Sequence, residues 1–247
     1  MSTPPLFLVD ELPAGDHTVL GGQEGRHAST VRRLRDGEPL VLSDGRGGIA
    51  EGVVDGVPEK TGTLGVRVLS RTVVPTPRPR VVVAQALVKG ERGELAVELA
   101  TEAGADAVVP WRASRCVARW DEGPRGAKAL ARWRSSVREA AKQARRAWVP
   151  EVADPVSTTE LAKLVADGAQ GLVLEGSANT PLTDVPLPDQ GDLLLVVGPE
   201  GGITDQELDT LTNAGAQAVR LGSTVLRAST AAAVALGALG ALTPRWT

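Results

Sequence analysis

The sequence predicts an α/β protein whose C-terminal part holds a mostly parallel sheet and whose N-terminal part is a small β-rich domain. Short runs of Leu and Val, such as residues 193–197, end abruptly at a glycine before a helix start. That is the pattern of a strand buried on both faces of a parallel sheet. A proline-rich stretch separates these runs from an N-terminal region of short apolar runs and turns. Since 42% of the 247 residues are hydrophobic, the chain can bury a sizeable core.

Residues 1–72 are predicted to form a small β-barrel. Apolar runs at residues 6–9, 40–42, 49–54 and 64–69 alternate with Asp-Gly turn pairs, which is a hairpin signal. Residues 24–35 between them have helical character and carry Arg26, Arg32, Arg33 and Arg35. Such a cluster is most often a solvated helix face. The alternative is a surface that contacts phosphates.

Residues 73–80 are predicted to be an extended linker, because Pro75, Pro77 and Pro79 forbid a helix. Residues 81–247 then form the second domain. A strand at 81–87, a helix at 91–103 and a strand at 105–110 read as a βαβ unit. A long Ala-rich helix is expected at 126–148, followed by a helix at 156–170 that Ser157 or Thr158 caps.

Positive charge gathers on the predicted helix at 126–148, although the formal net charge of the chain is -3. The neutral interpretation is an ordinary surface helix. A local electrostatic footprint for RNA explains the concentration better, and Arg138, Arg145 and Arg146 are its candidate contacts. Trp148, at the end of this helix, is predicted either to pack or to stack on a base.

Composition excludes several classes of protein. The single cysteine, Cys116, rules out an intramolecular disulfide framework and is expected to be a buried, unreactive thiol. No His/Cys/Asp cluster has metal-ligand spacing, so no metal is expected. Residues 1–13 lack the features of a signal peptide, and the apolar run at 231–242 is too short to span a bilayer. We expect a cytoplasmic protein with no membrane partner.

Three strand ends carry small-residue loops, at residues 171–178, 193–208 and 218–230. In the second loop Thr204 is a good helix N-cap, and Glu207 completes a capping box. This loop has neither a dinucleotide fingerprint nor a P-loop, and by itself it is as consistent with a tight turn as with a ligand site. Three such loops at the carboxyl ends of neighbouring strands predict a pocket built mainly from backbone, suited to an adenosine-like ligand.

The residues Gly198-Pro199-Glu200-Gly201-Gly202, followed by Leu221-Gly222 and Val225-Leu226-Arg227, resemble the C-terminal signature of the SPOUT class of RNA methyltransferases. More narrowly they resemble the RsmE-type family. Residues 27–38, 86–104 and 138–152 are similar to further segments of that family, so the resemblance covers almost the whole chain. It implies an S-adenosylmethionine-dependent enzyme that methylates N3 of uridine 1498 in 16S ribosomal RNA of the small subunit.

The resemblance also implies a deep trefoil knot that holds the cofactor, a PUA-like N-terminal domain and a homodimer. The expected cofactor-binding residues are Leu174, Glu175, Gly176, Val197, Gly198, Pro199, Glu200, Gly201, Gly202, Ile203, Leu221, Gly222, Ser223, Val225 and Leu226. The RNA-contacting set adds Lys89 to the arginines named above. Arg227 is the candidate catalytic residue. The general base stays unassigned, because Ser229-Thr230 stands where the family commonly has Glu-Thr.

Two other functions remain open. One is a SPOUT enzyme that methylates a ribose 2′-oxygen, which the N-terminal barrel and residues 81–104 disfavour. The other is a non-catalytic rRNA-binding assembly factor, which the intact glycines of the three loops disfavour.

Overall fold

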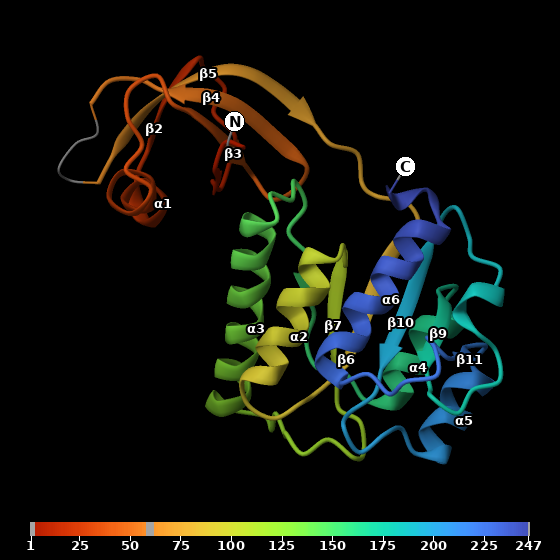
Figure 1. Ribbon diagram of the computed structural model, residues 1–247. Coiled ribbons are helices and arrows are strands. Elements are labelled where there is room, and N and C mark those ends of the chain that lie inside the picture. Colours follow the sequence, from red (N-terminus) through yellow and green to blue (C-terminus); the bar gives the residue numbers. More distant parts are fainter. Residues whose placement is uncertain (1–2, 58–61, 247) are drawn as a thin grey trace. The chain divides into compact units, whose positions relative to one another are not determined.

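The computed structural model describes residues 3–57 and 62–246, and these form two compact units (Figure 1). The first unit contains the chain up to Thr76 together with Ala141–Val149, and the second contains Pro77–Ala140 and the chain from Pro150 onward. The segment 141–149 was expected in the second domain. It belongs to the first because Val149 donates its N–H to the Gly45 carbonyl and Trp148 donates its indole N–H to the Val74 carbonyl.

The first unit is built on a sheet that has five strands within the described residues, in the order β1-β3-β4-β5-β2. β1 pairs with β3 in parallel and the other neighbours are antiparallel. The predicted strands are present, and a further strand, β2, was missed because its residues are mostly exposed. The strand bounds are β1 (Leu6–Leu8), β2 (His17–Leu20), β3 (Pro39–Ser43), β4 (Gly48–Val54) and β5 (Leu64–Val73).

The predicted helix at 24–35 is shorter and less regular than expected. It consists of α1 (Gly22–Arg26), which continues into a π-helical turn at His27–Val31. The turn ends where Arg33 takes a left-handed backbone with φ of 54°. The segment packs on the core of the unit through Ala28 and Leu34, and this leaves its arginines outside.

The second unit holds a sheet that has six strands within the described residues, all parallel, in the order β11-β9-β10-β6-β7-β8. In the sheet, β7 and β8 follow β6 on one side, whereas β10, β9 and β11 lie on the other side of β6. The strand order therefore reverses where β10 lies beside β6, a position where open sheets bind ligands. The bounds are β6 (Arg80–Ala86), β7 (Ala107–Trp111), β8 (Glu151–Val152), β9 (Gln170–Leu174), β10 (Asp192–Val197) and β11 (Gln217–Val219).

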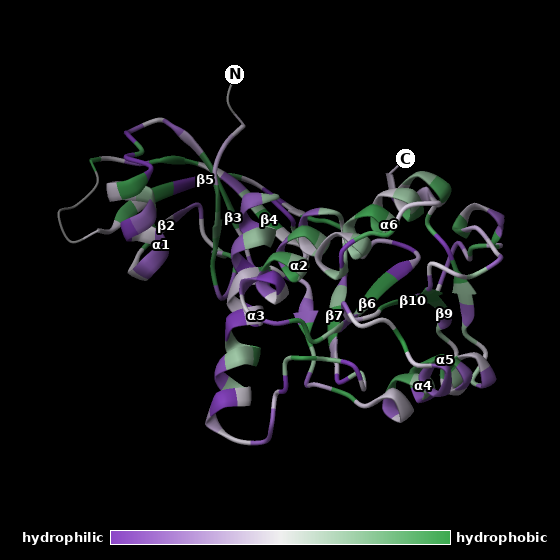
Figure 2. Ribbon diagram, turned by 60° about the horizontal axis from the view of Figure 1, so that its bottom comes forward, coloured by the Kyte–Doolittle hydropathy of each residue, from purple (hydrophilic) through white to green (hydrophobic). Residues whose placement is uncertain are grey.

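Helices cover both faces of this sheet, and alternate strand residues serve different cores. In β6, Val81 and Val83 face a core shared with α6 (Ala228–Leu242) and α2 (Glu91–Glu102). Val82 and Ala84 face the core formed with α4 (Thr158–Ala166) and α5 (Asp205–Asn213). The central strands are consequently mostly hydrophobic, with β10 almost wholly green in Figure 2 and β6 green over most of its length. The predicted α/β class is confirmed.

Helix α3 (Pro124–Gln143) ends five residues before the predicted residue 148. Its end is a Schellman motif: Arg146 donates its N–H to the Ala141 carbonyl, and Arg145 donates to Lys142. Arg145 has the left-handed φ of 55° that the motif requires, at a position where glycine is usual. Trp148 lies beyond the helix and packs over Gly47, where a Cβ would approach its ring to 2.6 Å. Trp148 therefore packs within the first unit, which is one of the two roles that the sequence left open.

A buried ion pair links the turn at Pro244–Trp246 to Asp106, the residue before β7. The Arg245 guanidinium lies 2.6 Å from the Asp106 carboxylate, and both side chains are less than 10% exposed. Arg245 also donates to the carbonyls of Pro79 and Gly104. These bonds satisfy a buried cation, which would be costly without partners.

Candidate functional site

A cavity of about 560 Å³ lies at the carboxyl ends of β9 and β10 in the second unit. The three loops that the sequence singled out contribute to its wall, together with the first residues of α2 and α6. Its size is within the range of small-molecule sites, which are about 300–1,000 Å³. The lining residues are Arg92, Leu174, Glu175, Gly176, Val197, Gly198, Pro199, Glu200, Gly202, Ile203, Val225, Leu226, Arg227, Ala228, Ser229 and Ala231.

Eleven of the expected cofactor residues and the expected catalytic residue, Arg227, thus share one cavity. Four expected residues do not line it: Gly201, Leu221, Gly222 and Ser223. Gly201 turns its carbonyl outward, where it accepts a hydrogen bond of 3.0 Å from Arg115. Gly222 and Ser223 are exposed on the third loop.

Four residues of the lining were not predicted from the sequence: Arg92, Ala228, Ser229 and Ala231. The last three form the first turn of α6, whose N-cap is Arg227. A Ser/Thr cap was expected here, so α6 begins earlier than predicted. The position of Arg92 could have been predicted from the sequence. It lies at the start of a helix that follows a buried strand, as the glycine loop does.

The glycines of the second loop have different structural reasons. Gly202 has φ of +76°, and its N–H closes a turn onto the Pro199 carbonyl at 2.9 Å. A Cβ on Gly198 would lie 2.7 Å from Ile203, so packing within the loop excludes any side chain there. These two glycines are therefore required for the turn itself.

Neither a left-handed backbone nor close packing requires glycine at Gly176, in the first loop. Its φ is not in the left-handed region, and a Cβ added there would meet nothing within 4 Å. Gly176 lines the cavity, so we expect a larger side chain at this position to narrow the site without disturbing the fold.

The Glu207 carboxylate holds the end of the second loop in place through hydrogen bonds. It is only 5% exposed, and it accepts hydrogen bonds from the backbone N–H and hydroxyl groups of both Thr204 and Ser114. Thr158 adds a bond of 3.2 Å. Burial alone would raise the pKa of Glu207, but the bonds from Ser114 and Thr204 hold it below its usual value. The carboxylate ties α5, α4 and the loop after β7 into one frame, and the predicted capping box is confirmed.

Four charged side chains line the cavity. Glu175 accepts two hydrogen bonds from Ser177, both of 3.1 Å. Glu200 lies 3.9 Å from Arg92, with both side chains partly exposed. Arg227 projects from the N-cap of α6 and is exposed. The cavity therefore has two cations and two carboxylates around an otherwise apolar and backbone wall.

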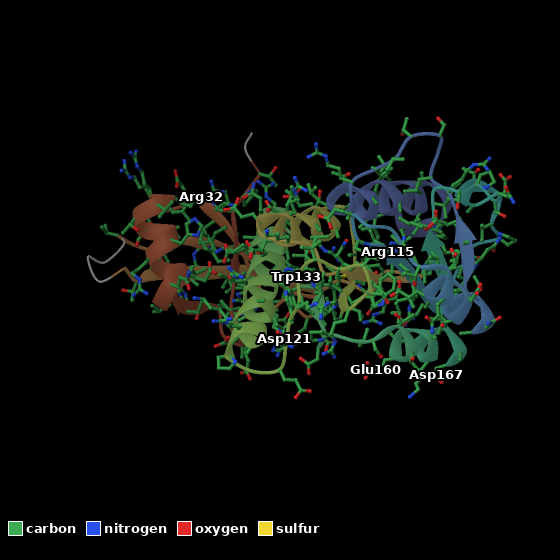
Figure 3. All side chains as sticks on the ribbon, turned by 90° about the horizontal axis from the view of Figure 1, so that it is seen from below. Arg32, Arg115, Asp121, Trp133, Glu160 and Asp167 are labelled. Carbon is green, nitrogen blue, oxygen red and sulfur yellow. The ribbon has the colours of Figure 1, made fainter. Side chains whose placement is uncertain are left out.

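The expected RNA-contacting residues divide between the units. Arg26, Arg32, Arg33 and Arg35 are exposed in the first unit, and Figure 3 labels Arg32 there. Arg33 keeps its exposed cation on a left-handed backbone that costs a non-glycine residue of the order of 1 kcal/mol or more. Lys89 and Arg138 are exposed in the second unit.

The basic helix contributes less free charge than the sequence suggests. Lys142 is only 9% exposed and lies 2.9 Å from Glu24, so it is part of the packing of the first unit. Arg145 donates to the Thr3 carbonyl. Arg132 and Arg134 pair with Glu94 and Asp154.

Two other classes of site have no counterpart in the described residues. No group of three or more His, Cys, Asp or Glu side chains is arranged to hold a metal ion within residues 3–57 and 62–246. Within the same residues, no helix has the length and apolarity needed to cross a membrane.

Comparison with known proteins gives consistent results. Residues 75–240 match the family described as RNA methyltransferase domain, and residues 20–66 match the RNA methyltransferase PUA domain. The chain is 56% identical to ribosomal RNA small subunit methyltransferase E of Mycobacterium bovis, over 98% of this chain and 93% of the relative. It is 31% identical to the Bacillus subtilis protein of the same name, over 94% and 91%.

Solved structures agree with these sequence matches. Ribosomal RNA small subunit methyltransferase E from Neisseria gonorrhoeae bound to S-adenosyl methionine superimposes with a TM-score of 0.86, 28% identity and 98% coverage of both chains. A Legionella pneumophila methyltransferase in complex with the same cofactor gives a TM-score of 0.83 at 28% identity, covering 98% of this chain and 99% of that one. The chain belongs to the ribosomal RNA small subunit methyltransferase E family, with a SPOUT methyltransferase domain and a PUA domain.

Proposed function

We propose that the protein transfers a methyl group from S-adenosylmethionine to N3 of uridine 1498 in 16S ribosomal RNA, acting on the small ribosomal subunit. The observation that carries the proposal is the cavity formed by three loops at the carboxyl ends of β9 and β10. Full-length similarity to the methyltransferase E proteins supports the choice of RNA and base.

The cavity fits S-adenosylmethionine in its chemistry. Leu174, Val197 and Ile203 offer apolar surface to an adenine ring, and Gly176 leaves room for close approach to the backbone. Glu175 is a hydrogen-bond acceptor for hydroxyl or ammonium groups. Arg92, at the start of α2, is a partner for a carboxylate. When bound, the cofactor supplies an electrophilic methyl group on a sulfonium.

The residues of the chain then have three tasks. The glycine loop and its support, Glu207, hold the reacting groups in line, because positioning is the main requirement of a displacement reaction. Arg227 stabilises the negative charge that develops on the uracil ring as its N3 proton passes to solvent. Glu200, a carboxylate of the cavity wall, is a hydrogen-bond acceptor on the same side as Arg92.

We also propose that the protein acts as a homodimer through the outer surface of α2 and α6. Three apolar side chains there remain exposed: Leu95 by 42%, Val234 by 47% and Leu242 by 45%. These helices pack on each other, and exposed apolar side chains on such a pair are typical of an association surface. Val234→Glu is expected to convert a dimer to a monomer in sedimentation measurements, whereas a monomeric wild-type protein would contradict this assignment.

The decisive test of the function is nucleoside mass analysis of 16S RNA and of small subunits after incubation with protein and S-adenosylmethionine. A methylated uridine with the group on N3 of the base is expected, and subunits are expected to be the better substrate. A methyl group on ribose would keep the fold and change the reaction. Cofactor-independent RNA binding with no methylation would indicate an assembly factor.

A further inference from the structure

A second cavity of about 440 Å³ lies in the same unit, at the carboxyl ends of β6 and β7. The long connection between β7 and α3 forms most of its wall, and Leu87 closes one side. Long connections without secondary structure of their own are frequently functional. The lining residues are Leu87, Arg112, Ala113, Ser114, Cys116, Ala118, Arg119, Trp120, Asp121 and Glu122.

The connection that lines this cavity is bonded to the glycine loop of the cofactor site. Arg115, from the same connection, donates to the Gly201 carbonyl at 3.0 Å. Ser114, which lines the second cavity, donates to Glu207, the carboxylate that caps the helix after the glycine loop. The connection that lines the second cavity is therefore bonded to the glycine loop of the cofactor site, so a polymeric substrate can contact both cavities.

The second cavity contains a rigid aromatic surface. Trp120 is half-buried, and its ring centroid lies 4.8 Å from that of Trp133 at an interplanar angle of 77°. Trp133 lies on α3, close to the connection that carries Asp121 (Figure 3). A Cβ on Gly93 would lie 3.0 Å from the Trp133 indole nitrogen, so α2 approaches closely behind this pair. Trp120 is therefore held in place from one side.

The charges around the cavity match a nucleotide better than a free anion. Arg119 is an exposed cation at the wall. Asp121 and Glu122 would repel a phosphate inside the cavity, but they can accept hydrogen bonds from the amino groups of a base. Burial raises the pKa of the Cys116 thiol, so this part of the wall is uncharged at neutral pH.

We propose that the second cavity binds a nucleobase of the RNA substrate beside the target uridine, stacked on Trp120 with the adjoining phosphate at Arg119. The inference rests on the proposed function and adds a second contact point for its substrate. Base stacking on an aromatic side chain tolerates any base identity. The role of the cavity is therefore to hold the strand while the target uridine enters the neighbouring site.

The test measures binding of a 16S RNA fragment that contains the target uridine, together with calorimetric titration of S-adenosylmethionine. Trp120→Leu keeps apolar volume but removes the aromatic ring, and a loss of about ten- to a hundredfold in RNA affinity is expected. Trp120→Phe restores most of that affinity. Cofactor affinity stays unchanged in both variants. Equal RNA affinity for the wild-type protein and a folded Trp120→Leu variant would overturn the proposal.

Charge is tested with a matched pair in the same unit. Arg119→Gln is expected to lower the slope of log affinity against log salt by about 1. Lys163→Gln, an exposed lysine on α4 outside both cavities, is expected to leave it unchanged. Identical slopes for the two variants would remove Arg119 from the contact.

A third experiment uses the wild-type protein, so it tests the base site even if Trp120→Leu fails to fold. RNA fragments with an abasic residue at single positions next to the target should bind about tenfold more weakly at one of them. Uniform affinity across these fragments would contradict the proposal. If one abasic position weakens binding but the protein methylates no RNA, the proposed reaction is overturned and the base site is not.

Discussion

The cofactor cavity and the arginine surface of residues 26–35 are built on opposite principles. The cavity is shaped by backbone: Gly198 and Gly202 are fixed by their own turn, and Gly176 faces open space. The arginine surface consists of long exposed side chains on a short, irregular helical segment. Cofactor affinity should therefore respond to changes in the shape of the cavity, and RNA affinity should respond to changes in surface charge and salt concentration.

The largest effect is expected from Gly202→Val. The left-handed φ of +76° and a β-branched side chain conflict, so the turn in the cavity wall must change. We expect cofactor affinity to fall by more than a hundredfold in calorimetric titration. Gly191→Val is the control, because it has a similar φ of +83° at the amino end of β10 and should keep cofactor affinity. Equal losses in both variants would show that general strain, not the loop, is responsible.

The next effect concerns the charged surface. Replacing Arg32, Arg33 and Arg35 together by Ala should weaken RNA binding by roughly tenfold or more at low salt and lower the salt slope by about 3. Cofactor affinity should not change. Arg67→Ala, an exposed arginine on β5, is the control. A salt slope identical to that of the wild-type protein would exclude these arginines from the RNA contact.

Glu207→Gln tests the support of the glycine loop. A carboxylate that accepts several hydrogen bonds is replaced by an amide that also carries donors, and we expect a loss of about 2 kcal/mol in the free energy of unfolding. The folded pKa is lowered, so this stabilisation is present above the unfolded pKa of about 4.3 and is lost as pH falls through the folded value.

Denaturant titrations between pH 7 and pH 3 measure that dependence. The wild-type protein should lose more stability on acidification than Glu207→Gln does. Glu98→Gln, at an exposed position of α2, should behave as the wild type. Parallel pH profiles for the wild type and Glu207→Gln would show that the capping carboxylate does not contribute.

The smallest effect is a gain in stability. Arg33→Gly relieves the left-handed backbone and should raise the free energy of unfolding by about 1 kcal/mol while RNA affinity falls. Arg32→Gly, where φ is −76°, should instead lower stability. If Arg33→Gly is less stable than the wild type, the backbone at Arg33 is not strained.

The sequence predicted the parts of the molecule whose signals are local. Strands buried on both faces, such as β10, and the capping box at Thr204 and Glu207 follow from short patterns. The three glycine-ended loops pointed to the cavity for the same reason. Arg92 and Ser229 were missed because they reach the cavity from helices whose position depends on tertiary packing.

Other differences come from contacts distant in sequence. The helix expected to reach residue 148 ends at Gln143, because Trp148 and Val149 bond to the first unit instead. Lys142 adds to the positive charge of the predicted helix, but it pairs with Glu24, which lies 118 residues away in the sequence. β2 was missed because exposed strands carry little apolar signal. No local pattern encodes these pairings.

The most direct test of the backbone-built cofactor cavity is calorimetric titration of Gly176→Val with S-adenosylmethionine, alongside thermal unfolding. A Cβ at this position meets no atom within 4 Å, so the melting temperature should stay within a few degrees of the wild type. Because Gly176 lines the cavity, the larger side chain is expected to narrow it, and cofactor binding should be lost. Wild-type cofactor affinity in the folded variant would contradict the assignment of this cavity to the cofactor.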